Sequence, residues 1–300
     1  MMNKIEASIG ICAYNEERNI GHLLKSILEQ KTDCICIREI IVILDGSSDG
    51  TEGAVRDFVG EPRLRVIKLK ERCGKYAAVN TFLKNAHAPL LILASADIIL
   101  KEGCLVHLCA PFLCDERLGA AAARPIPVNE MTAFTGYAAH LYAHLRHCAA
   151  LTQPKFSELI AFRNVIKEIP PTTVDEEQIA CLMKDKGYRL AYVPEATYAN
   201  KGPESLQELI VQRRRYHWGH LLLKRRYHYA AVALKIGELK RELWKELPSF
   251  FKKHWGRLAG VFLLESGIRS LARLDFFFKD PALSYKWPIA LTTKYLDGKI

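Results

Sequence analysis

The sequence lacks long apolar runs, paired cysteines and glycine-rich phosphate loops. Its longest apolar stretches, residues 227–234 and 258–264, are far shorter than the roughly 20 residues that a membrane-spanning helix needs. None of its nine cysteines forms a Cys-x-x-Cys pair, which argues against a structural zinc site and indicates reduced thiols. No Gly-x-Gly-x-x-Gly motif follows the first apolar run, and no Walker-type lysine loop occurs. Residues 1–8 do not resemble a signal peptide, so we expect a cytoplasmic protein.

The chain is long enough for one large or two ordinary domains, and its charge is uneven. It has 300 residues, of which 49% are hydrophobic and 25% are charged, a composition typical of globular proteins. Residues 201–300 hold 20 basic and 9 acidic residues, whereas residues 1–200 hold 23 and 24. The positive excess therefore lies in the last third, where it favours a polyanionic partner over a merely solvated basic face. Such a partner is a membrane surface or a nucleic acid.

Strand-like apolar runs alternate with helical patterns through the first 100 residues, which predicts the doubly wound, mostly parallel sheet of an α/β fold. The predicted strands are residues 7–13, 38–44, 63–69 and 89–94. Polar turns containing Asn15, Asp45 and Asp97 follow three of them. Because the carboxyl ends of parallel strands meet at one edge of a sheet, we expect these turns to form a ligand site. There Asp97 could hold a divalent metal or could simply cap the next turn.

Four segments resemble the nucleotide-sugar half of family 2 glycosyltransferases, which are inverting enzymes with a GT-A fold. The segments are Ala13-Tyr-Asn-Glu-Glu, Asp45-Gly-Ser-Ser-Asp-Gly-Thr, Gly74-Lys-x-x-Ala-x-Asn80 and Ser95-Ala-Asp. Their order and spacing carry the resemblance, since each one alone is a weak signal. The resemblance implies that Asp45 meets the nucleobase and that Lys75 lies near the nucleotide. It also implies that Ala13, Asn15 and Glu17 line the nucleoside pocket.

The segment Ser95-Ala96-Asp97 departs from the usual family motif, which is Asp-x-Asp. The resemblance implies that Asp97 is the metal ligand, with Mg or Mn as the cofactor, and that Ser95 and Ala96 belong to the nucleotide-sugar site. A serine hydroxyl is a poorer ligand for a hard cation than a carboxylate. We therefore expect either weaker metal binding or a contact of Ser95 with the sugar or the ribose.

Three acidic residues at positions 175–177 begin an amphipathic helix that is predicted to stop at Gly187. Acidic side chains also stabilise a helix dipole, so a purely structural role is the alternative. Family members carry an acidic pair before Leu-x-x-x-Leu-x-x-x-Gly-Tyr, and counting back from Gly187 places that pair at Asp175 and Glu176. The resemblance implies that Glu176 takes the proton of the acceptor hydroxyl, with Asp175 as the other candidate.

The segment Gln212-Arg-Arg-Arg-Tyr216 resembles the Gln-x-x-Arg-Trp motif of membrane-associated, polysaccharide synthase-like members of the family. Here Tyr216 replaces the tryptophan, and Trp218 follows two residues later. An aromatic ring at this point can stack on a sugar while an arginine such as Arg215 meets the diphosphate. Gln212, Arg215, Tyr216 and Trp218 are therefore predicted nucleotide-sugar contacts, and a basic surface helix is the alternative.

The last 60 residues contain two aromatic and basic amphipathic patterns. Apolar residues alternate with lysines and arginines over residues 240–255. Further on, one helix face is predicted to carry Val261, Leu264, Ile268 and Leu271, with Glu265, Arg269 and Arg273 on another. Such helices suit either the membrane interface or packing against the catalytic domain. We expect a peripheral protein at the inner face of the membrane, with an anionic membrane surface as a partner.

We therefore predict a nucleotide-sugar and acceptor domain at residues 1–204 and a helical, amphipathic region at 205–300. The predicted function is metal-assisted, inverting transfer of a sugar from a UDP- or GDP-linked donor to a glycan or lipid-linked acceptor. A sugar-nucleotide nucleotidyltransferase is one alternative, but it needs a Gly-rich basic loop where this chain has Tyr14-Asn-Glu-Glu. A non-catalytic protein that binds nucleic acid or membrane through its basic third is another. The acidic motifs upstream argue against it, so no nucleic-acid partner is expected.

Overall fold

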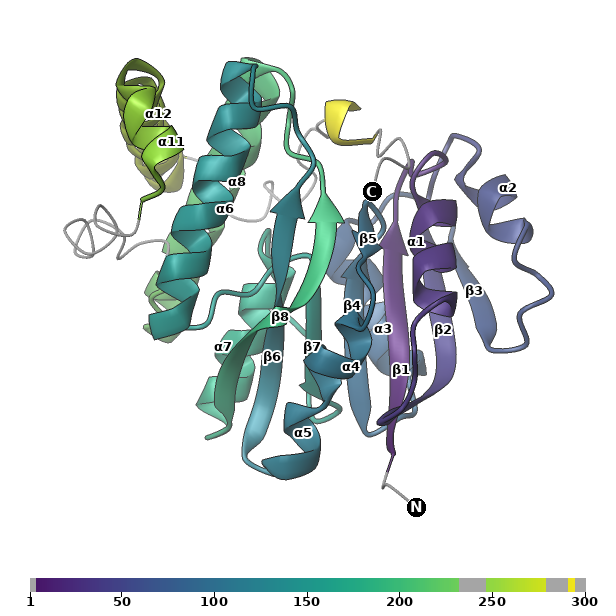
Figure 1. The fold of residues 1–300 in the computed structure, drawn as a ribbon. Helices are drawn as coiled ribbons and strands as arrows, with labels where there is room; N and C mark the ends of the chain where they lie inside the picture. The colour runs from purple at the N-terminus through teal and green to yellow at the C-terminus, as the bar shows by residue number, and fades with distance from the viewer. Residues whose placement is uncertain (1–3, 232–246, 279–290, 295–300) are drawn as a thin grey trace.

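The computed structural model describes residues 4–231, 247–278 and 291–294. An eight-stranded sheet runs through the described chain, with helices on both faces and a further group of helices beside one half of it (Figure 1). The strand order is β3-β2-β1-β4-β7-β6-β8-β5. The strands are β1 Ile5–Ala13, β2 Ile35–Asp45, β3 Leu64–Leu69, β4 Leu90–Ser95, β5 Ile98–Leu100, β6 Leu118–Pro127, β7 Leu159–Arg163 and β8 Arg189–Asn200.

The predicted α/β fold with a mostly parallel sheet is confirmed. Strands β3, β2, β1 and β4 are parallel neighbours, and β6 and β8 are parallel as well. Strand β7 runs antiparallel to both β4 and β6, and β5 runs antiparallel to β8. The helices are α1 Ile20–Leu28, α2 Thr51–Arg56, α3 Lys75–Asn85, α4 Cys104–Cys109, α5 Pro111–Cys114, α6 Phe134–Thr152, α7 Asp175–Asp185, α8 Leu206–Tyr227, α11 Ser249–Lys253 and α12 Trp255–Phe278, with a 3-10 turn at Leu291–Lys294.

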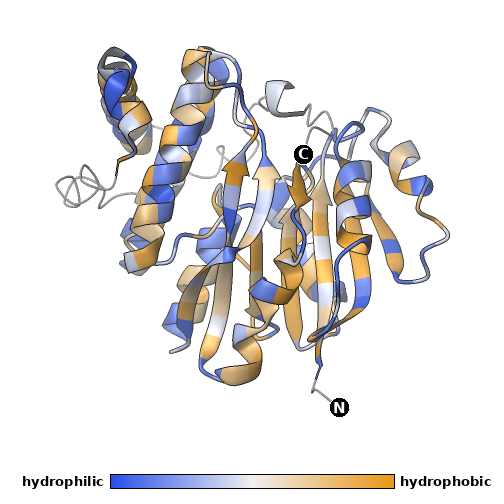
Figure 2. Ribbon diagram, viewed as in Figure 1, coloured by the Kyte–Doolittle hydropathy of each residue, from blue (hydrophilic) through white to orange (hydrophobic). Residues whose placement is uncertain are grey.

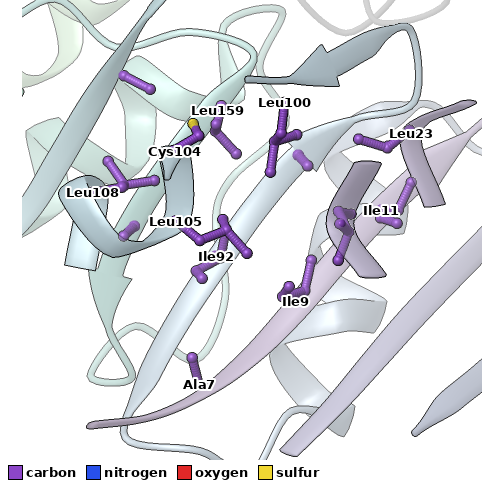
Figure 3. Packing of buried hydrophobic residues seen from close by; sticks show 14 of the residues in the cluster. Ala7, Ile9, Ile11, Leu23, Ile92, Leu100, Cys104, Leu105, Leu108 and Leu159 are labelled. Atoms are coloured by element: carbon purple, nitrogen blue, oxygen red, sulfur yellow. The ribbon is translucent and has the colours of Figure 1, made fainter. Parts of the chain in front are cut away.

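Alternation of side chains along the central strands divides the core into two layers. In β4, Leu90 and Ile92 face α1 and α4, whereas Leu91 and Leu93 face α3 and α7. Figure 3 shows the first of these layers, where Ile92 lies among side chains of β1 and α4. A Cβ atom at Gly10 of β1 would lie 2.5 Å from the ring of Phe82, so glycine there lets α3 approach the sheet. Both faces of the central strands are thus buried, which explains their unbroken apolar sequences.

Helices α6, α8, α11 and α12 form the group beside the sheet (Figure 1). Helix α8 begins at a cap in which the Ser205 hydroxyl accepts a hydrogen bond from the Glu208 amide at 3.2 Å, as its sequence predicts. Leu247 and Phe251 are buried against Tyr137 and Leu141 of α6. Part of the pattern at residues 240–255 therefore packs on the protein, and residues 240–246 of it lie outside the described residues. Within the described ranges, no helix has the length and apolarity to cross a membrane.

The predicted faces of α12 are partly wrong, because Glu265 lies on the buried face beside Val261 and Ile268. Its carboxylate accepts hydrogen bonds from Arg213 at 2.8 Å and from Arg269 at 3.0 Å, and lies 2.7 Å from His217 Nε2. Burial would raise the pKa of Glu265, but Arg213 and His217 outweigh it and lower that pKa. Arg213 and His217 belong to α8, and Arg269 belongs to α12 itself. Figure 2 shows hydrophilic stretches on the helices beside the sheet. The carboxylate thus joins α12 to α8.

We expect Glu265→Gln to lower the free energy of unfolding by about 3 kcal/mol, because it leaves buried cations without their anion. Urea unfolding measures the change. The matched control is Glu29→Gln, which removes an exposed ion pair with Lys25 at 3.9 Å and is expected to change stability little. Equal effects of the two substitutions would contradict the role of Glu265 as the link between α8 and α12.

Candidate active site

The carboxyl ends of β1, β2 and β4 meet at one edge of the sheet, as their parallel arrangement requires. Ala13 pairs with Leu44, next to Asp45, and Cys12 pairs with Ser95. A cavity of about 590 Å³ opens at this edge, beneath α8 and beside the start of α7. Of the residues predicted to form the site, it is lined by Ala13, Asp45, Lys75, Ser95, Ala96, Asp97, Asp175, Glu176, Gln212, Arg215 and Tyr216.

Lys75, the first residue of α3, lies at the centre of this cavity. Its ammonium group donates hydrogen bonds to Glu176 Oε1 at 2.6 Å and to Ser95 Oγ at 3.0 Å. The three residues come from segments up to 101 positions apart in the chain. Ala96 and Asp97 form the short turn between β4 and β5, which aims Asp97 into the same cavity. One ammonium group and three carboxylates, those of Asp97, Asp175 and Glu176, thus line one small volume.

The neighbouring charges give the two acids that begin α7 different pKa values. Burial raises the pKa of Asp175 to about 7, with the Glu176 charge adding to it and Lys75 opposing it. Burial would also raise the pKa of Glu176, but the ion pair with Lys75 outweighs this effect and lowers that pKa. Conversely, burial would lower the pKa of Lys75, and Glu176 and Asp175 together raise it. Glu176 is therefore ionised over a wider pH range than Asp175.

Asp45 holds the loop that leads into α3. Its two carboxylate oxygens accept hydrogen bonds from the backbone amides of Cys73 at 2.7 Å and Gly74 at 2.9 Å. Gly46, next along, has φ of +66°, and a Cβ there would lie 2.5 Å from the Arg72 backbone. Asp45 therefore positions Lys75 through this loop while its side chain also lines the cavity.

Asn15 and Glu17 lie outside the lining of the cavity. The Asn15 side chain accepts a hydrogen bond from the Ser48 amide at 2.9 Å, and Glu17 accepts one from the Gly50 amide at 2.9 Å. Both side chains thus tie the turn after β1 to the turn after β2. Tyr14 and Glu16, which alternate with Asn15 and Glu17 in the chain, do line the cavity. The Arg72 guanidinium stacks over the Tyr14 ring at 4.4 Å.

Trp218 is directed away from the cavity although Tyr216 lines it. Residues two apart on a helix do not share a face, so the two rings of α8 point in different directions. The Trp218 ring is buried and meets Phe276 of α12 edge-on, with 6.3 Å between centroids. Within the predicted motif, Gln212, Arg215 and Tyr216 line the cavity and Trp218 packs between α8 and α12.

Further polar residues, to which the sequence motifs assign no catalytic or nucleotide-sugar role, also line the cavity. Arg146 comes from α6, and Lys155, Glu158 and Glu177 come from the chain before β7 and from α7. Lys155 donates to Glu177 Oε1 at 2.9 Å, and the Tyr229 hydroxyl donates to the other oxygen of Glu177 at 3.0 Å. Their spacing in the sequence matches no motif, and only the fold brings them together.

A model of a protein family, Glycosyl transferase family 2, matches residues 8–172, which is more than half of the chain. The chain belongs to glycosyl transferase family 2. The family match ends before Asp175 and Glu176, so the assignment of those two acids rests on their spacing in the sequence and on their place in the cavity. The segments that resemble the family in sequence, up to Asp97, all lie inside the match.

Curated relatives and solved structures agree with this family. Poly-beta-1,6-N-acetyl-D-glucosamine synthase from Staphylococcus aureus is 28% identical over an alignment of 228 residues that covers 72% of this chain and 55% of the relative. The Staphylococcus epidermidis enzyme of that name is 25% identical over the same coverage. The chain thus spans about half the length of the curated relatives it matches.

Two solved structures have a similar fold. One is the mannosyltransferase PcManGT from Pyrobaculum calidifontis, in complex with GDP-Man and Mn²⁺, with a TM-score of 0.60, 22% identity and coverage of 90% of this chain and 74% of that one. The other is glucosyl-3-phosphoglycerate synthase from Mycobacterium tuberculosis with Mn²⁺, UDP and glucosyl-3-phosphoglycerate, with a TM-score of 0.53, 20% identity and coverage of 74% and 80%. The predicted GT-A fold is therefore confirmed.

Proposed function

We propose that this protein transfers a sugar from a UDP- or GDP-linked donor to a glycan or lipid-linked acceptor, with inversion at the anomeric carbon. The observation that carries this proposal is the convergence of Lys75, Asp97 and Glu176 in one cavity at the carboxyl edge of a family 2 sheet. Two structural neighbours were solved with Mn²⁺ and a nucleotide or nucleotide sugar, which supports a nucleotide-linked donor. The alternative function, sugar-nucleotide nucleotidyl transfer, needs a Gly-rich basic loop after β1. This chain has Tyr14-Asn-Glu-Glu at that place.

The residues present fit a cation that arrives with the donor. In the described part of the chain, no three His, Cys, Asp or Glu side chains form a group that could enclose a metal ion. Asp97 supplies one carboxylate in the cavity, and Ser95 already accepts a hydrogen bond from Lys75. Mg²⁺ and Mn²⁺ sites of this kind use one or two carboxylates together with substrate phosphates. When bound, the ion would offset the negative charge of the diphosphate leaving group.

In the proposed reaction the acceptor hydroxyl oxygen attacks the anomeric carbon, and its proton passes to Glu176 Oε. The bond from that carbon to the diphosphate breaks, and the nucleoside diphosphate leaves with the electron pair. Arg215 and Lys75 stabilise the charge that develops on the diphosphate, and Tyr216 stacks on a sugar ring. Asp45, Ala13, Asn15 and Glu17 form and support the nucleoside side of the site.

Helix α8 completes the donor cavity, and the region at residues 205–300 is the part that we propose meets a membrane surface. Exposed apolar side chains of α12 include Trp255, Leu263 and Phe277, which are 76%, 75% and 79% exposed. Together with the basic excess of this region, they suit peripheral attachment to anionic lipid. We place the boundary of the nucleotide-sugar domain at residues 204 and 205, and α8 beyond it contributes Gln212, Arg215 and Tyr216 to the donor cavity.

Nucleotide binding provides the test. We expect UDP or GDP to bind to the wild-type protein in the presence of Mn²⁺ and to bind roughly tenfold more weakly after EDTA treatment or in Asp97→Asn. Titration calorimetry measures both effects. The control is Asp115→Asn, at a half-buried surface residue paired with Arg189 far from this edge. Absence of nucleotide binding to the wild-type protein with every base tested would refute the proposal.

A further inference from the structure

The carboxyl edge of the sheet presents the site residues in the order of its strands, β2, β1, β4 and β7. Asp45 ends β2 and Ala13 ends β1, on the proposed nucleoside side of the cavity. Ser95 ends β4, and the turn that contains Asp97 follows it. Strand β7 runs antiparallel to β4, so it begins at this same edge, with Leu159. A nucleotide sugar with its nucleoside at β2 and β1 and its diphosphate at β4 therefore points its sugar toward the start of β7.

Glu158, the residue just before β7, lies beside the turn that follows β4. Its backbone oxygen accepts a hydrogen bond from the Ser95 amide at 2.7 Å, and its side chain lines the cavity with Asp97 and Glu176. Burial raises the pKa of Glu158, and the charges of Asp97 and Glu176 add to the rise, so the three carboxylates lie near one another. In the proposed reaction the sugar lies between the diphosphate at Asp97 and the base Glu176. Glu158 therefore borders the sugar.

One oxygen of the Glu158 carboxylate is held by the protein and the other is available to a ligand. Oε2 accepts hydrogen bonds from the Tyr198 hydroxyl and from the Asn200 side-chain amide, both at 2.9 Å. In the part of the chain that the structure describes, Oε1 accepts no hydrogen bond. Arg146 of α6 faces the carboxylate and offsets part of its charge, but its terminal nitrogen donates to the Ser157 hydroxyl. A hydroxyl group that donates to Oε1 would stabilise the ionised carboxylate.

We infer that Glu158 recognises the sugar of the donor by accepting, through Oε1, a hydrogen bond from one of its hydroxyl groups. This inference rests on the proposed function and adds a specificity-determining residue to its donor site. A hydrogen bond to a carboxylate is charge-assisted, and a buried acceptor that loses its donor weakens binding, so a donor without that hydroxyl is disfavoured. Glu158 holds the sugar in this arrangement, whereas Glu176 deprotonates the acceptor.

The affinities of sugar nucleotides and of free nucleotides test the inference. The probes are UDP-glucose, UDP-N-acetylglucosamine, GDP-mannose, UDP and GDP, each titrated calorimetrically with Mn²⁺. Glu158→Gln should weaken at least one sugar nucleotide by about tenfold and leave UDP and GDP unchanged, because only the sugar meets this side chain. Glu195→Gln, at an exposed residue of β8 outside the cavity, is the matched control. If Glu158→Gln changes sugar nucleotides and free nucleotides by the same factor, or changes neither, the inference is wrong.

Fluorinated donors identify the hydroxyl group that Glu158 binds. Fluorine is similar in size to a hydroxyl group but donates no hydrogen bond, so each analogue of the affected donor carries fluorine in place of one sugar hydroxyl. One analogue should bind about tenfold more weakly than its parent to the wild-type protein and nearly as well as its parent to Glu158→Gln. Losses that are equal in the two proteins for every analogue would overturn the assignment.

Transfer assays separate the donor sugar from the acceptor as the ligand of Glu158. Glu158→Gln should raise the KM of the donor and leave that of the acceptor unchanged, whereas a rise confined to the acceptor would overturn the inference. Glu158→Asp keeps the charge but withdraws the carboxylate by one methylene, so it should raise the donor KM as well. Normal binding of UDP or GDP without an effect of Glu158→Gln refutes this inference alone. Failure of both nucleotides to bind the wild-type protein refutes the proposed function and this inference with it.

Discussion

Glu176→Gln is expected to reduce the turnover of sugar transfer by about 1,000-fold, because a positioned general base contributes factors of this order. Glutamine keeps the shape of the side chain and can still accept a hydrogen bond from Lys75, which lies 2.6 Å from Glu176 Oε1. Nucleotide affinity should therefore be unchanged. Asp185→Asn, an exposed residue in the last turn of the same helix, is the matched control and should retain full turnover.

The pH dependence of kcat/KM distinguishes the two candidate bases. A base must be deprotonated to act, so activity falls as the pH drops through its pKa. The pKa of Glu176 is lowered from its usual value of 4.5, which places the acid limb of the wild-type profile below that pH. The pKa of Asp175 is raised to about 7, so an acid limb near neutral pH would assign the base to Asp175. A larger loss in Asp175→Asn than in Glu176→Gln would support the same reassignment.

Lys75→Met is expected to reduce kcat/KM at pH 7 by about 100-fold and to move the acid limb to higher pH. The ammonium group is the main influence that lowers the pKa of Glu176 against burial, and its removal lets that pKa rise. At pH 7 less of the base is then ionised, and a cation that meets the diphosphate is lost. Part of the activity should therefore return as the pH is raised. Measurement of kcat/KM from about pH 3 to about pH 9 tests both effects, since the wild-type limb lies at acid pH.

Two further variants separate chemistry from folding. Lys84→Met removes an exposed lysine from the last turn of the same helix and should leave the pH profile unchanged. Lys75→Arg keeps the positive charge and should hold the acid limb near its wild-type position, even if turnover falls because the guanidinium is larger. If Lys75→Met has the Tm of the wild-type protein and an unchanged acid limb, Lys75 does not set the pKa of Glu176.

The motifs of the first 100 residues predicted the fold and one side of the site. Strand ends at Asp45 and Asp97 could be placed at one edge because parallel strands connected through helices leave little choice of geometry. The same reasoning could not separate residues that face the cavity from residues that build its rim. Asn15 and Glu17 belong to the rim, because the turn reverses direction at Asn15, which has φ of +53°.

Contacts between distant helices could not be predicted from the sequence. Arg146 meets the cavity only because α6 packs beside β6 and β8, and no spacing within α6 marks it. The pattern predicts Glu265 on a different face of α12 from Val261 and Ile268, yet it is buried beside them, because three cations from α8 and α12 compensate its charge. Helix α12 also carries apolar side chains on its exposed side, such as Leu263 and Phe277, so that its apolar pattern does not identify the buried face.

A donor screen that follows release of nucleotide tests the central claim most directly. The purified chain would be incubated with UDP- and GDP-linked sugars and Mn²⁺, with and without anionic lipid vesicles and EDTA. The proposed site predicts metal-dependent release of UDP or GDP from at least one donor, with release abolished in Glu176→Gln although nucleotide still binds. Release that is the same in Glu176→Gln as in the wild-type protein, or no release from any donor with any acceptor, would contradict it.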